Sequence, residues 1–417
     1  MKTFKLPFEE GSLKLTVKTL KKYAPLNLEN YKLLAKTRKI SFDNEILTIG
    51  VAFPNEDEEK VYLNIQFDHL QIGCSVDTDE TYLGLYAYTA LEKMISYNQY
   101  YNFEEFYWPG FFEPKSGKSI YLNILNDRLG MDIELKSEYS PFYKPGHKLF
   151  YPKISIKELS EISIELIEPL LPCNDLLALG YCFVNPSPDS IRPENWPILI
   201  PYLMIPQVKG KSVRKFISFI SIYADMLIDE YPDIQAKLNS LCCRMKSLAP
   251  IAIESDFQTA DNNDRIRQSN IKNRDQLYFL WKQAVPKLIP QPFIHYLNTY
   301  SLKYVKGKPS KKYMQACKIS AASPKLYFSI QEKGDFYELK LLFKVKNQVF
   351  SPDLNHKVFF ISSIIDPLNL YFLSTLQDVD IVAQFAKYEF CMSILKCHYH
   401  SHFKRYKEKL EACYEFI

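Results

Sequence analysis

The chain has 417 residues, of which 47% are hydrophobic and 15% aromatic, and its formal net charge is +4. This composition excludes a disordered chain, which would have few aromatic residues and a high net charge. The length suits two or three domains. Because the net charge is small, any binding to nucleic acid has to rest on local basic patches.

The cysteines and the apolar segments indicate a cellular compartment. Nine cysteines occur without regular spacing, and Cys242 and Cys243 are adjacent, so we expect free thiols rather than a disulfide framework. The first residues, MKTFKLPFEEGSLKL, lack the apolar core of a signal peptide. No apolar run approaches the roughly 20 residues of a membrane span. We therefore predict a cytoplasmic protein with no membrane partner.

The first predicted elements lie within residues 1–105. A short helix is predicted over residues 12–23, and an alternating apolar pattern predicts a strand from Leu47 to Phe53. A second alternating pattern starts at Val61, includes Phe67, and runs on through Leu70 and Ile72 to a cysteine. A polar turn over 77–80 then precedes a helix. Its apolar face has i, i+3, i+4, i+7 spacing and consists of Leu83, Tyr86, Ala87, Ala90, Leu91, Met94 and Ile95.

A hairpin that ends at a cysteine and leads into a helix resembles the frame of a SWIM-type zinc finger. That finger places a C-x-C pair on the strand and a C-x-H pair at the start of the helix. Here only Cys74 matches a ligand, and the other three positions are Val76, Gly84 and Tyr86. Structural zinc takes about four N or S ligands. We therefore predict a degenerate finger with no metal and no other cofactor, in which Val76 and Tyr86 fill the vacated site.

The wider chain resembles the non-motor, N-terminal region of bacterial (Bacteroidota-type) SWI/SNF-class helicases. The stretches that carry the resemblance beyond the finger are Leu179-Gly180-Tyr181, Pro201 to Pro206, Lys308 to Lys312, Gly334 to Tyr337, Val358 to Ser362 and His398 to Tyr414. The resemblance implies a SWIM-like finger, a mixed helical region and a β-rich helicase-associated segment. The chain stops where the ATP-driven motor of that family would begin.

Residues 99–150 are rich in aromatic residues and turn formers, and we interpret them as a packed irregular connector. They contain Ser116-Gly117-Lys118-Ser119, which invites comparison with a phosphate-binding loop. Such a loop needs a glycine five residues before its second glycine, and that position is Phe112. We therefore predict no nucleotide site here.

From 151 to about 318 we predict a mainly helical region. It starts with a helix of mixed character over 154–167, a loop over 185–188 and an extended proline-rich run over 193–206. Apolar stripes predict helices over 213–227, 238–248 and 277–284, and the polar stretch 255–275 is expected to be an exposed loop or the start of a charged helix.

A basic cluster near the end of this region is the candidate binding site. Five lysines fall within ten residues without an acid, and Tyr304 and Tyr313 flank them: Lys303, Lys306, Lys308, Lys311 and Lys312. Lysines on a turn neutralise phosphates, and tyrosine stacks on bases. The pattern favours contact with DNA or RNA, although a solvated linker between two domains would have the same composition. A weaker basic patch is Lys404, Arg405, Lys407 and Lys409.

Residues 319–417 are predicted to begin with a hairpin. Leu326 to Ile330 and Tyr337 to Val345 alternate on either side of a turn over 332–335. Further strands are predicted near 358–361 and 370–373, and helices near 376–386 and 400–414.

The segment Cys397-His398-Tyr399-His400-Ser401-His402 is a possible metal site, with Cys391 and Cys413 nearby. On a helix, however, successive histidines two residues apart point about 200° apart and do not converge. We interpret them as histidines that stack or form hydrogen bonds on an aromatic-rich helix.

The sequence thus predicts an α+β protein with three parts. These are a SWIM-like strand–strand–helix unit over 1–105, a mainly helical region over 106–318, and a hairpin-rich helicase-associated-like unit over 319–417. No motif of an ATPase motor, of an activated nucleophile or of a metalloprotease is present. We predict a non-catalytic accessory or regulatory module of a SWI/SNF-class helicase system that contacts nucleic acid. The alternative is a protein-interaction or structural subunit that docks on a separately encoded motor.

Overall fold

The structure is a computed structural model that describes residues 2–9, 12–25, 35–95, 99–127, 130–154, 177–186, 196–207, 212–220, 233–248, 260–299, 302–355 and 357–417. Both strands and helices are present, which confirms the α+β class. The chain forms two compact units. Unit 1 comprises Met1–Leu149, Gln331–Leu339 and Met392–Lys407, and unit 2 comprises Phe150–Ile330, Lys340–Cys391 and Glu408–Ile417. These bounds differ from the three predicted domains, whose division stays a prediction.

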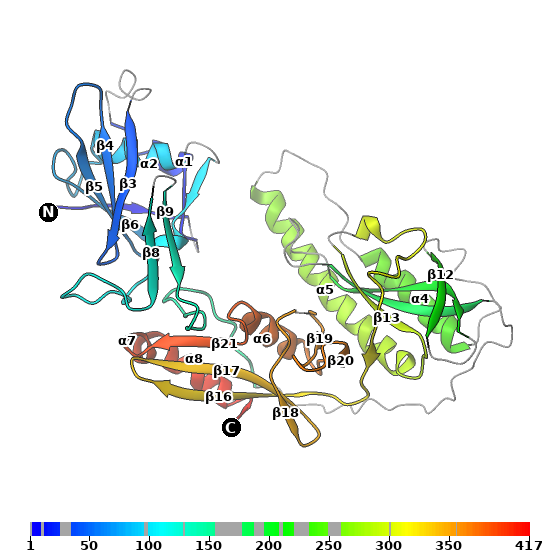
Figure 1. Cartoon of the computed structure of the whole chain (residues 1–417). Helices are drawn as coiled ribbons and strands as arrows, with labels where there is room; N and C mark the ends of the chain where they lie inside the picture. Colours follow the sequence, from blue (N-terminus) through cyan, green and yellow to red (C-terminus); the bar gives the residue numbers. More distant parts are fainter. Residues whose placement is uncertain are drawn as a thin grey trace. The chain divides into compact units, whose positions relative to one another are not determined.

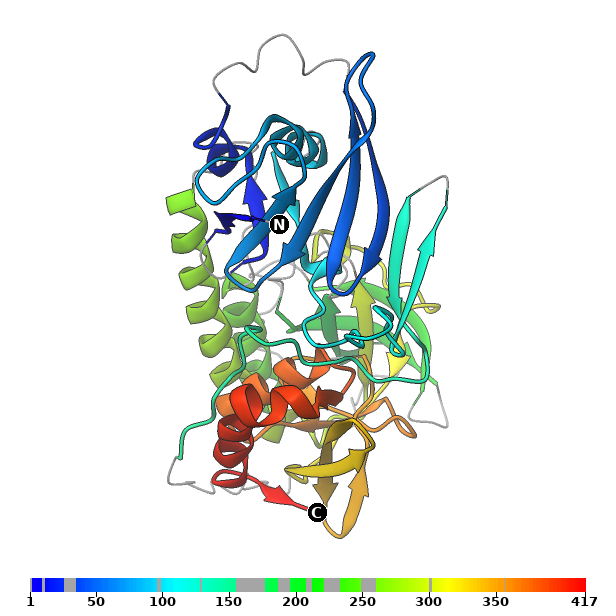
Figure 2. The same ribbon diagram turned by 90° about the vertical axis from the view of Figure 1, so that its left-hand side faces the viewer.

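Unit 1 is built on an antiparallel sheet with the strand order β1-β6-β5-β4-β3 (Figures 1 and 2). The strands are β1 (Phe4–Pro7), β3 (Lys36–Asp43), β4 (Ile46–Ala52), β5 (Glu59–Ile65) and β6 (His69–Cys74). Two small ladders pair β2 (Lys14–Thr16) with β7 (Tyr100–Asn102) and β8 (Leu122–Asn126) with β9 (Met131–Leu135). The helices are α1 (Val17–Lys21), α2 (Leu85–Ile95) and the single turn η1 (Glu104–Phe106).

The predicted strand–strand–helix order of residues 61–95 is confirmed. Val61, Leu63 and Ile65 of β5 are buried, since alternate residues of a strand point to the same face of the sheet. Helix α2 contacts β4, β5 and β6 and buries Ala87, Ala90, Leu91 and Ile95. Phe67, which the alternation assigned to the strand, lies in the turn and is 43% exposed. The helix predicted over 12–23 is shorter than expected, because Lys14–Thr16 is strand β2.

The aromatic stretch 99–150 packs largely into the core of unit 1. Its buried rings include Phe103, Phe106 and Phe111, and the rings of Phe111 and Phe142 lie 5.1 Å apart, edge to face. The hairpin β8–β9 within this stretch was not predicted.

Unit 2 contains a five-stranded mixed sheet with the order β12-β11-β10-β13-β14. Its strands are β10 (Ala178–Pro186), β11 (Ile198–Pro206), β12 (Val213–Phe219), β13 (Ile294–Thr299) and β14 (Gln315–Ala316). All nine residues of β10 are buried, as expected for a central strand that pairs in parallel with β13. Helices α4 (Asp233–Leu248) and α5 (Ala260–Leu288) contact each other, and α4 contacts β11. The fully buried Trp281 of α5 donates a hydrogen bond to Pro197 O at 2.9 Å.

The helix predicted from residue 213 is wrong for Val213–Phe219, which is strand β12. Val213, Phe216 and Phe219 are buried three residues apart, a spacing that resembles a helix. The register between β11 and β12 shifts twice, so that Tyr202 faces Phe219, Met204 faces Phe216 and Pro206 faces Val213. Each bulge inserts one residue into β12, which stretches the inward spacing from two residues to three.

The remaining elements form smaller sheets and the C-terminal helices. A three-stranded sheet has the order β15-β20-β19, and another has the order β18-β17-β16-β22, with β21 paired to β17. Their bounds are β15 (Lys318–Ile319), β16 (Lys325–Lys333), β17 (Phe336–Val345), β18 (Gln348–Phe350), β19 (Phe360–Ile361), β20 (Asn369–Phe372), β21 (Cys391–Leu395) and β22 (Glu415–Phe416). The predicted hairpin is confirmed as β16–β17, and Gly334 supplies the positive φ of its turn.

Two C-terminal helical segments were also predicted. Helix α6 (Leu376–Ala386) begins at Thr375, whose side chain accepts a hydrogen bond from Asp378 N at 3.0 Å. The second segment begins before residue 400 and ends at Glu411. It consists of α7 (Lys396–His398), the π-helical turn η3 (Tyr399–Phe403) and α8 (Lys404–Glu411).

The middle of the chain differs from the mainly helical region predicted. The described residues between 106 and 318 form strands β8 to β14 as well as α4 and α5. Helices predicted over 238–248 and 277–284 are confirmed, and the run to Pro206 is strand β11. Residues 155–167, 187–188, 221–227 and 255–259 of the predicted elements lie outside the described residues.

Candidate nucleic-acid interface

Residues 302–313, which we name the lysine loop, join β13 to the edge strand β14 within unit 2. The loop begins with the single turn η2 (Leu302–Tyr304), and Val305 is buried. Gly307 has a φ of +65°, and its carbonyl accepts a hydrogen bond of 2.7 Å from Phe219 N of β12. Because the loop joins two strands of one sheet, it is not the solvated linker between domains that its composition also allowed.

The polar side chains of the lysine loop face solvent. Lys306, Lys308, Lys311 and Lys312 are exposed, and within the described part of the chain no carboxylate lies within ion-pair distance of them. Tyr304 is 74% exposed and Tyr313 is 58% exposed. The Lys312 Nζ atom lies 5.4 Å from the centre of the Tyr313 ring. The side chain of Lys303 lies outside the described residues, so the structure brings together four of the five predicted lysines and both tyrosines.

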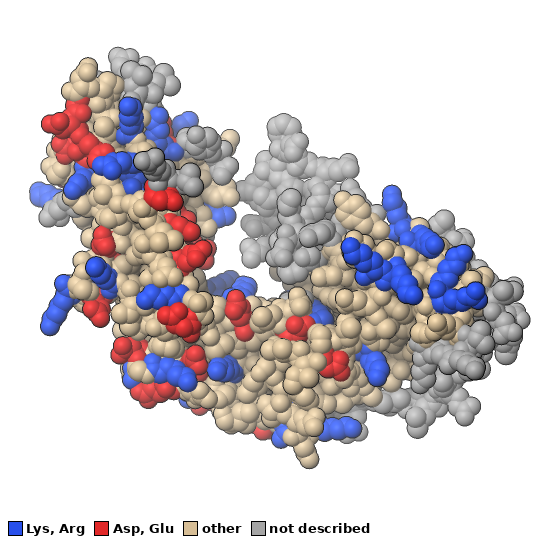
Figure 3. Space-filling view, in the orientation of Figure 1, with Lys and Arg blue, Asp and Glu red and all other residues tan. Residues whose placement is uncertain are grey.

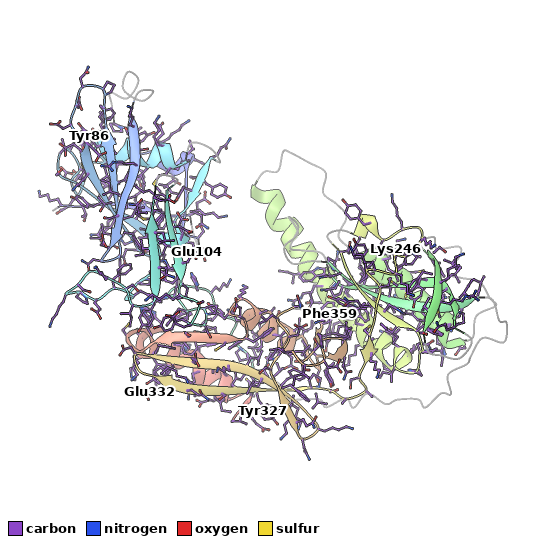
Figure 4. The ribbon with its side chains drawn as sticks, in the orientation of Figure 1. Tyr86, Glu104, Lys246, Tyr327, Glu332 and Phe359 are labelled. Atoms are coloured by element: carbon purple, nitrogen blue, oxygen red, sulfur yellow. The ribbon has the colours of Figure 1, made fainter. Side chains whose placement is uncertain are left out.

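The charge around this loop is strongly one-sided. No Asp or Glu occurs between Asp275 and Glu332, whereas nine lysines do: Lys282, Lys287, Lys303, Lys306, Lys308, Lys311, Lys312, Lys318 and Lys325. Arg214 and Lys215 of β12 and Arg244 of α4 are also exposed. On the face shown in Figure 3, basic side chains gather on the part of unit 2 that contains β12, α4 and β13, with no acidic side chain visible among them. Lys246 of α4, labelled in Figure 4, lies in this part.

The two acids that bound this span are already paired. Asp275 forms an ion pair with Arg274 at 2.9 Å, and Glu332 forms one with Lys396. The net charge of the whole chain conceals this acid-free span. Counting charges segment by segment would have found it. The basic residues of β12 and α4 lie outside this span and were not predicted.

A pocket of about 420 Å³ adjoins the lysine loop. It is lined by Tyr296, Asn298, Tyr313, Gln315, Asp353, Asn355, Lys357, Pro367 and Leu368, all of which belong to unit 2. Its volume falls within the roughly 300–1,000 Å³ that is usual for small-molecule sites. Tyr313 belongs both to this pocket and to the lysine loop.

A buried ion pair lies in the wall of the pocket. Lys357 Nζ is 2.6 Å from Asp353 Oδ2, and their side chains are 3% and 12% exposed. Lys357 also donates hydrogen bonds to Asn355 O at 3.1 Å and Ser362 Oγ at 2.9 Å. An ammonium group has three protons, so all its donors are engaged. Burial lowers the pKa of Lys357, while Asp353 acts in the opposite direction.

The hairpin and helix of residues 61–95 contain a carboxylate where the resemblance would place a metal site. Asp77 Oδ2 accepts hydrogen bonds from Leu85 N at 2.6 Å and Tyr86 N at 3.4 Å at the start of α2. Val76 is 52% exposed, so the expectation that it fills the site is wrong. The Tyr86 ring is partly buried against the core, 4.9 Å from the Phe53 ring, and its hydroxyl donates to Glu56 Oε2 at 2.6 Å, so for Tyr86 the expectation stays a prediction. Tyr86 is labelled in Figure 4. Gly84 is required beside Asp77, since a Cβ there would clash with its carboxylate.

The remaining candidates form no site for chemistry. In the segment 116–119 the Gly117 and Lys118 amides donate to Glu113 O and Ser116 Oγ, and strand β8 follows rather than a helix, so these two amides do not cradle a phosphate.

His398 is buried 6.2 Å from the Phe111 ring, and burial lowers its pKa to about 4. Among the described residues no group of three His, Cys, Asp or Glu side chains is placed to bind a metal. In the weaker basic patch on α8, Lys404, Arg405 and Lys409 are exposed.

Comparisons with protein-family models, with curated proteins and with solved structures found no match for this chain. The resemblance to SWI/SNF-class helicases therefore remains a hypothesis based on the stretches quoted above. Within the described ranges, no helix combines the length and apolar character needed to cross a membrane.

Proposed function

We propose that this chain is a non-catalytic module that contacts DNA or RNA through the lysine loop. The observation that supports this most strongly is the set of four exposed lysines, Lys306, Lys308, Lys311 and Lys312, which have no carboxylate partner among the described residues. A lysine that is already paired with an acid gains little free energy on binding phosphate, because it exchanges one ionic partner for another. Here the lysines are available, and the backbone that positions them is hydrogen-bonded to β12.

The exposed tyrosines of the loop support the same proposal. A side chain such as Tyr304, 74% exposed, leaves a large apolar ring in water unless a partner covers it. Bases stack on such rings, while neighbouring lysines neutralise the phosphates. The tyrosines of the loop thus suit the bases of a nucleic-acid strand, and the lysines suit its phosphates.

Two charge-reversal variants test this proposal, one at the lysine loop and one at a control site. The first changes the loop (Lys306→Glu, Lys308→Glu, Lys311→Glu and Lys312→Glu), and the control changes exposed basic residues of α8 (Lys404→Glu, Arg405→Glu and Lys409→Glu). Binding to labelled single- and double-stranded DNA and RNA is measured by fluorescence anisotropy at about 50 mM salt. We expect the loop variant to lose binding and the α8 control to retain most of it. Equal binding by wild type and loop variant, or no binding by wild type, would overturn the proposal.

The cellular role that we propose is accessory or regulatory, in a cytoplasmic SWI/SNF-class helicase system. It is supported by the resemblance of stretches such as Lys308 to Lys312 and Gly334 to Tyr337. This role predicts that the chain changes the ATP hydrolysis rate of an added SWI/SNF-class motor in the presence of DNA. An unchanged rate at saturating chain concentration would argue against the helicase role and leave the nucleic-acid binding unaffected.

A set of exposed apolar side chains in unit 2 favours the second candidate, a subunit that docks on a separately encoded motor. Val349, Leu354, Ile364 and Ile365 are 46%, 60%, 59% and 89% exposed. A bridge between Pro352 and Ser363 brings their two segments together in unit 2. Clustered exposed apolar residues mark interaction surfaces. The variant Ile364→Asp/Ile365→Asp is expected to abolish binding to a motor protein without affecting anisotropy with nucleic acid. Unchanged motor binding would exclude this surface.

A further inference from the structure

We infer that the pocket beside the lysine loop holds one unstacked base of a single-stranded nucleic acid whose phosphates lie on the loop. This inference rests on the proposed function and specifies its ligand. It is based on the register of two strands, on the neutral character of the pocket and on the tyrosine that the two sites share.

The strand register gathers the polar wall of the pocket on one face. Tyr296 of β13 lies opposite Gln315 of β14 in an antiparallel pair. Asn298 is two residues after Tyr296 on β13. Because alternate residues of a strand share a face, the side chains of Tyr296, Asn298 and Gln315 line the same wall. Tyr313, in the turn that precedes β14, lines the pocket with them. The segments 353–357 and 367–368 form the rest of the pocket.

The pocket offers hydrogen bonds but no available positive charge. Its one lysine, Lys357, has its three donors engaged by Asp353, Asn355 and Ser362. A phosphate would therefore meet an ammonium group that is already neutralised, whereas the exposed lysines outside the pocket are not. This distribution favours phosphate on the loop and an uncharged polar group in the pocket.

The lining groups match the edge and the face of a base. Within the described residues no hydrogen bond engages the side-chain amides of Asn298 and Gln315, and each amide offers both a donor and an acceptor. Tyr296 accepts a hydrogen bond from Asn185 Nδ2 at 3.1 Å, and burial raises its pKa to about 12, so its hydroxyl stays protonated. Tyr313, 58% exposed, supplies a ring face on which a base can stack.

The sequence continuity of the loop connects the two sites. Lys311 and Lys312 directly precede Tyr313, so a base stacked on this ring places its own phosphates beside two lysines. A base can enter the pocket only if it is not paired in a duplex. The inference therefore predicts a preference for single-stranded over double-stranded nucleic acid of the same length.

An oligonucleotide without bases separates the two contributions. Wild type is titrated, at the same salt concentration, with a single-stranded oligonucleotide, with its fully abasic counterpart and with the matching duplex. The abasic strand lacks both the base in the pocket and any base stacked on Tyr304, so we expect it to bind at least roughly 5-fold more weakly than the normal strand, the loss expected for one stacking contact. Tyr313→Ala and, separately, Asn298→Ala/Gln315→Ala should reduce this difference. The control Tyr82→Ala, an exposed tyrosine of unit 1, should leave it unchanged.

The outcomes distinguish the inference from the function on which it rests. Three outcomes would overturn the base pocket and leave binding through the lysine loop intact. They are equal affinity for normal and abasic strands, duplex binding as tight as single-strand binding, and no effect of either pocket variant. If wild type binds none of the three ligands, the proposed function fails, and the inference fails with it.

Discussion

The buried pair Lys357–Asp353 allows a quantitative prediction about the pocket wall. In the variant Lys357→Met the side-chain volume is nearly preserved, but three hydrogen bonds and the charge of Lys357 are lost. Asp353, only 12% exposed, then has no cationic partner among the residues that the structure describes. Removing one partner of a buried ion pair costs about 3–5 kcal/mol, because the remaining charge is buried without compensation.

We therefore expect Lys357→Met to lower the free energy of unfolding by about 3–5 kcal/mol at pH 7. The double variant Asp353→Asn/Lys357→Met leaves no buried charge and should recover most of the loss.

Urea unfolding followed by tryptophan fluorescence is a suitable assay. Trp281 is fully buried in unit 2 and its ring lies 5.0 Å from Phe360, close to the loop that contains the pair. Phe359, labelled in Figure 4, is buried in the same segment. A Trp108→Phe background removes the tryptophan of unit 1, so that the signal reports on unit 2. Lys325→Met, at an exposed lysine of β16, serves as the control and should stay within about 0.5 kcal/mol of wild type.

Two results would refute this reasoning. A loss below about 1 kcal/mol for Lys357→Met at pH 7 would show that the pair is not buried as described. A loss that the double variant does not recover would show that packing rather than the unpaired carboxylate determines the cost.

Three further predictions concern other parts of the structure. The variant Asp77→Ala removes the carboxylate that accepts a hydrogen bond from Leu85 N. Hydrogen exchange of the α2 amides should then show a local opening free energy that is lower by about 1–2 kcal/mol. Protection equal to that of wild type would contradict a capping role for Asp77. Burial lowers the pKa of His295 to about 4, so the unfolded state takes up a proton below pH 6.5 that the folded state does not. The contribution of neutral His295 to the free energy of unfolding is therefore complete above pH 6.5 and falls by up to about 3 kcal/mol toward pH 4. Urea titrations at several pH values measure this loss. An equal loss in a His295→Gln variant would contradict the prediction. Gly180→Ala places a methyl group against the Tyr202 ring, whose hydroxyl lies 2.7 Å from His295 Nδ1. The variant should lower the free energy of unfolding by about 1–3 kcal/mol and with it the thermal midpoint. An unchanged midpoint would contradict the close approach of Gly180 to the Tyr202 ring.

Local patterns predicted the elements whose contacts are local. The hairpin β16–β17 follows from two alternating runs around Gly334, and α6 follows from an apolar stripe after Thr375. Strand β5 followed by β6 and α2 was predicted for the same reason. In each case one face of the element is buried throughout, so the period of the sequence equals the period of the structure.

Elements that depend on distant partners were not predictable in this way. The bulges of β12 arise from its pairing with β11, and they changed an inward period of two into an apparent helical period. The parallel pairing of β10 with β13 joins residues more than 100 positions apart, such as Tyr181 and Ile294. No local pattern contains that information.

The candidate site was predictable only in part. The lysines are a contiguous cluster and were found, but the pocket beside them combines β13, β14 and the segments 353–357 and 367–368. The cap of α2 by Asp77 was missed for a related reason, since this residue lies eight positions before Leu85 and not at the usual capping position. Folding brings these side chains together, and sequence spacing does not show it.

The salt dependence of single-strand binding tests the central claim most directly. Each phosphate neutralised on a single strand contributes about −0.7 to the slope of log K against log salt concentration, so four lysines predict a slope of about −2.8. Replacing Lys306, Lys308, Lys311 and Lys312 one at a time by Ala should make the slope less steep by about 0.7 in each case. A wild-type slope near zero, or single-lysine variants with the slope of wild type, would contradict a nucleic-acid interface at the lysine loop.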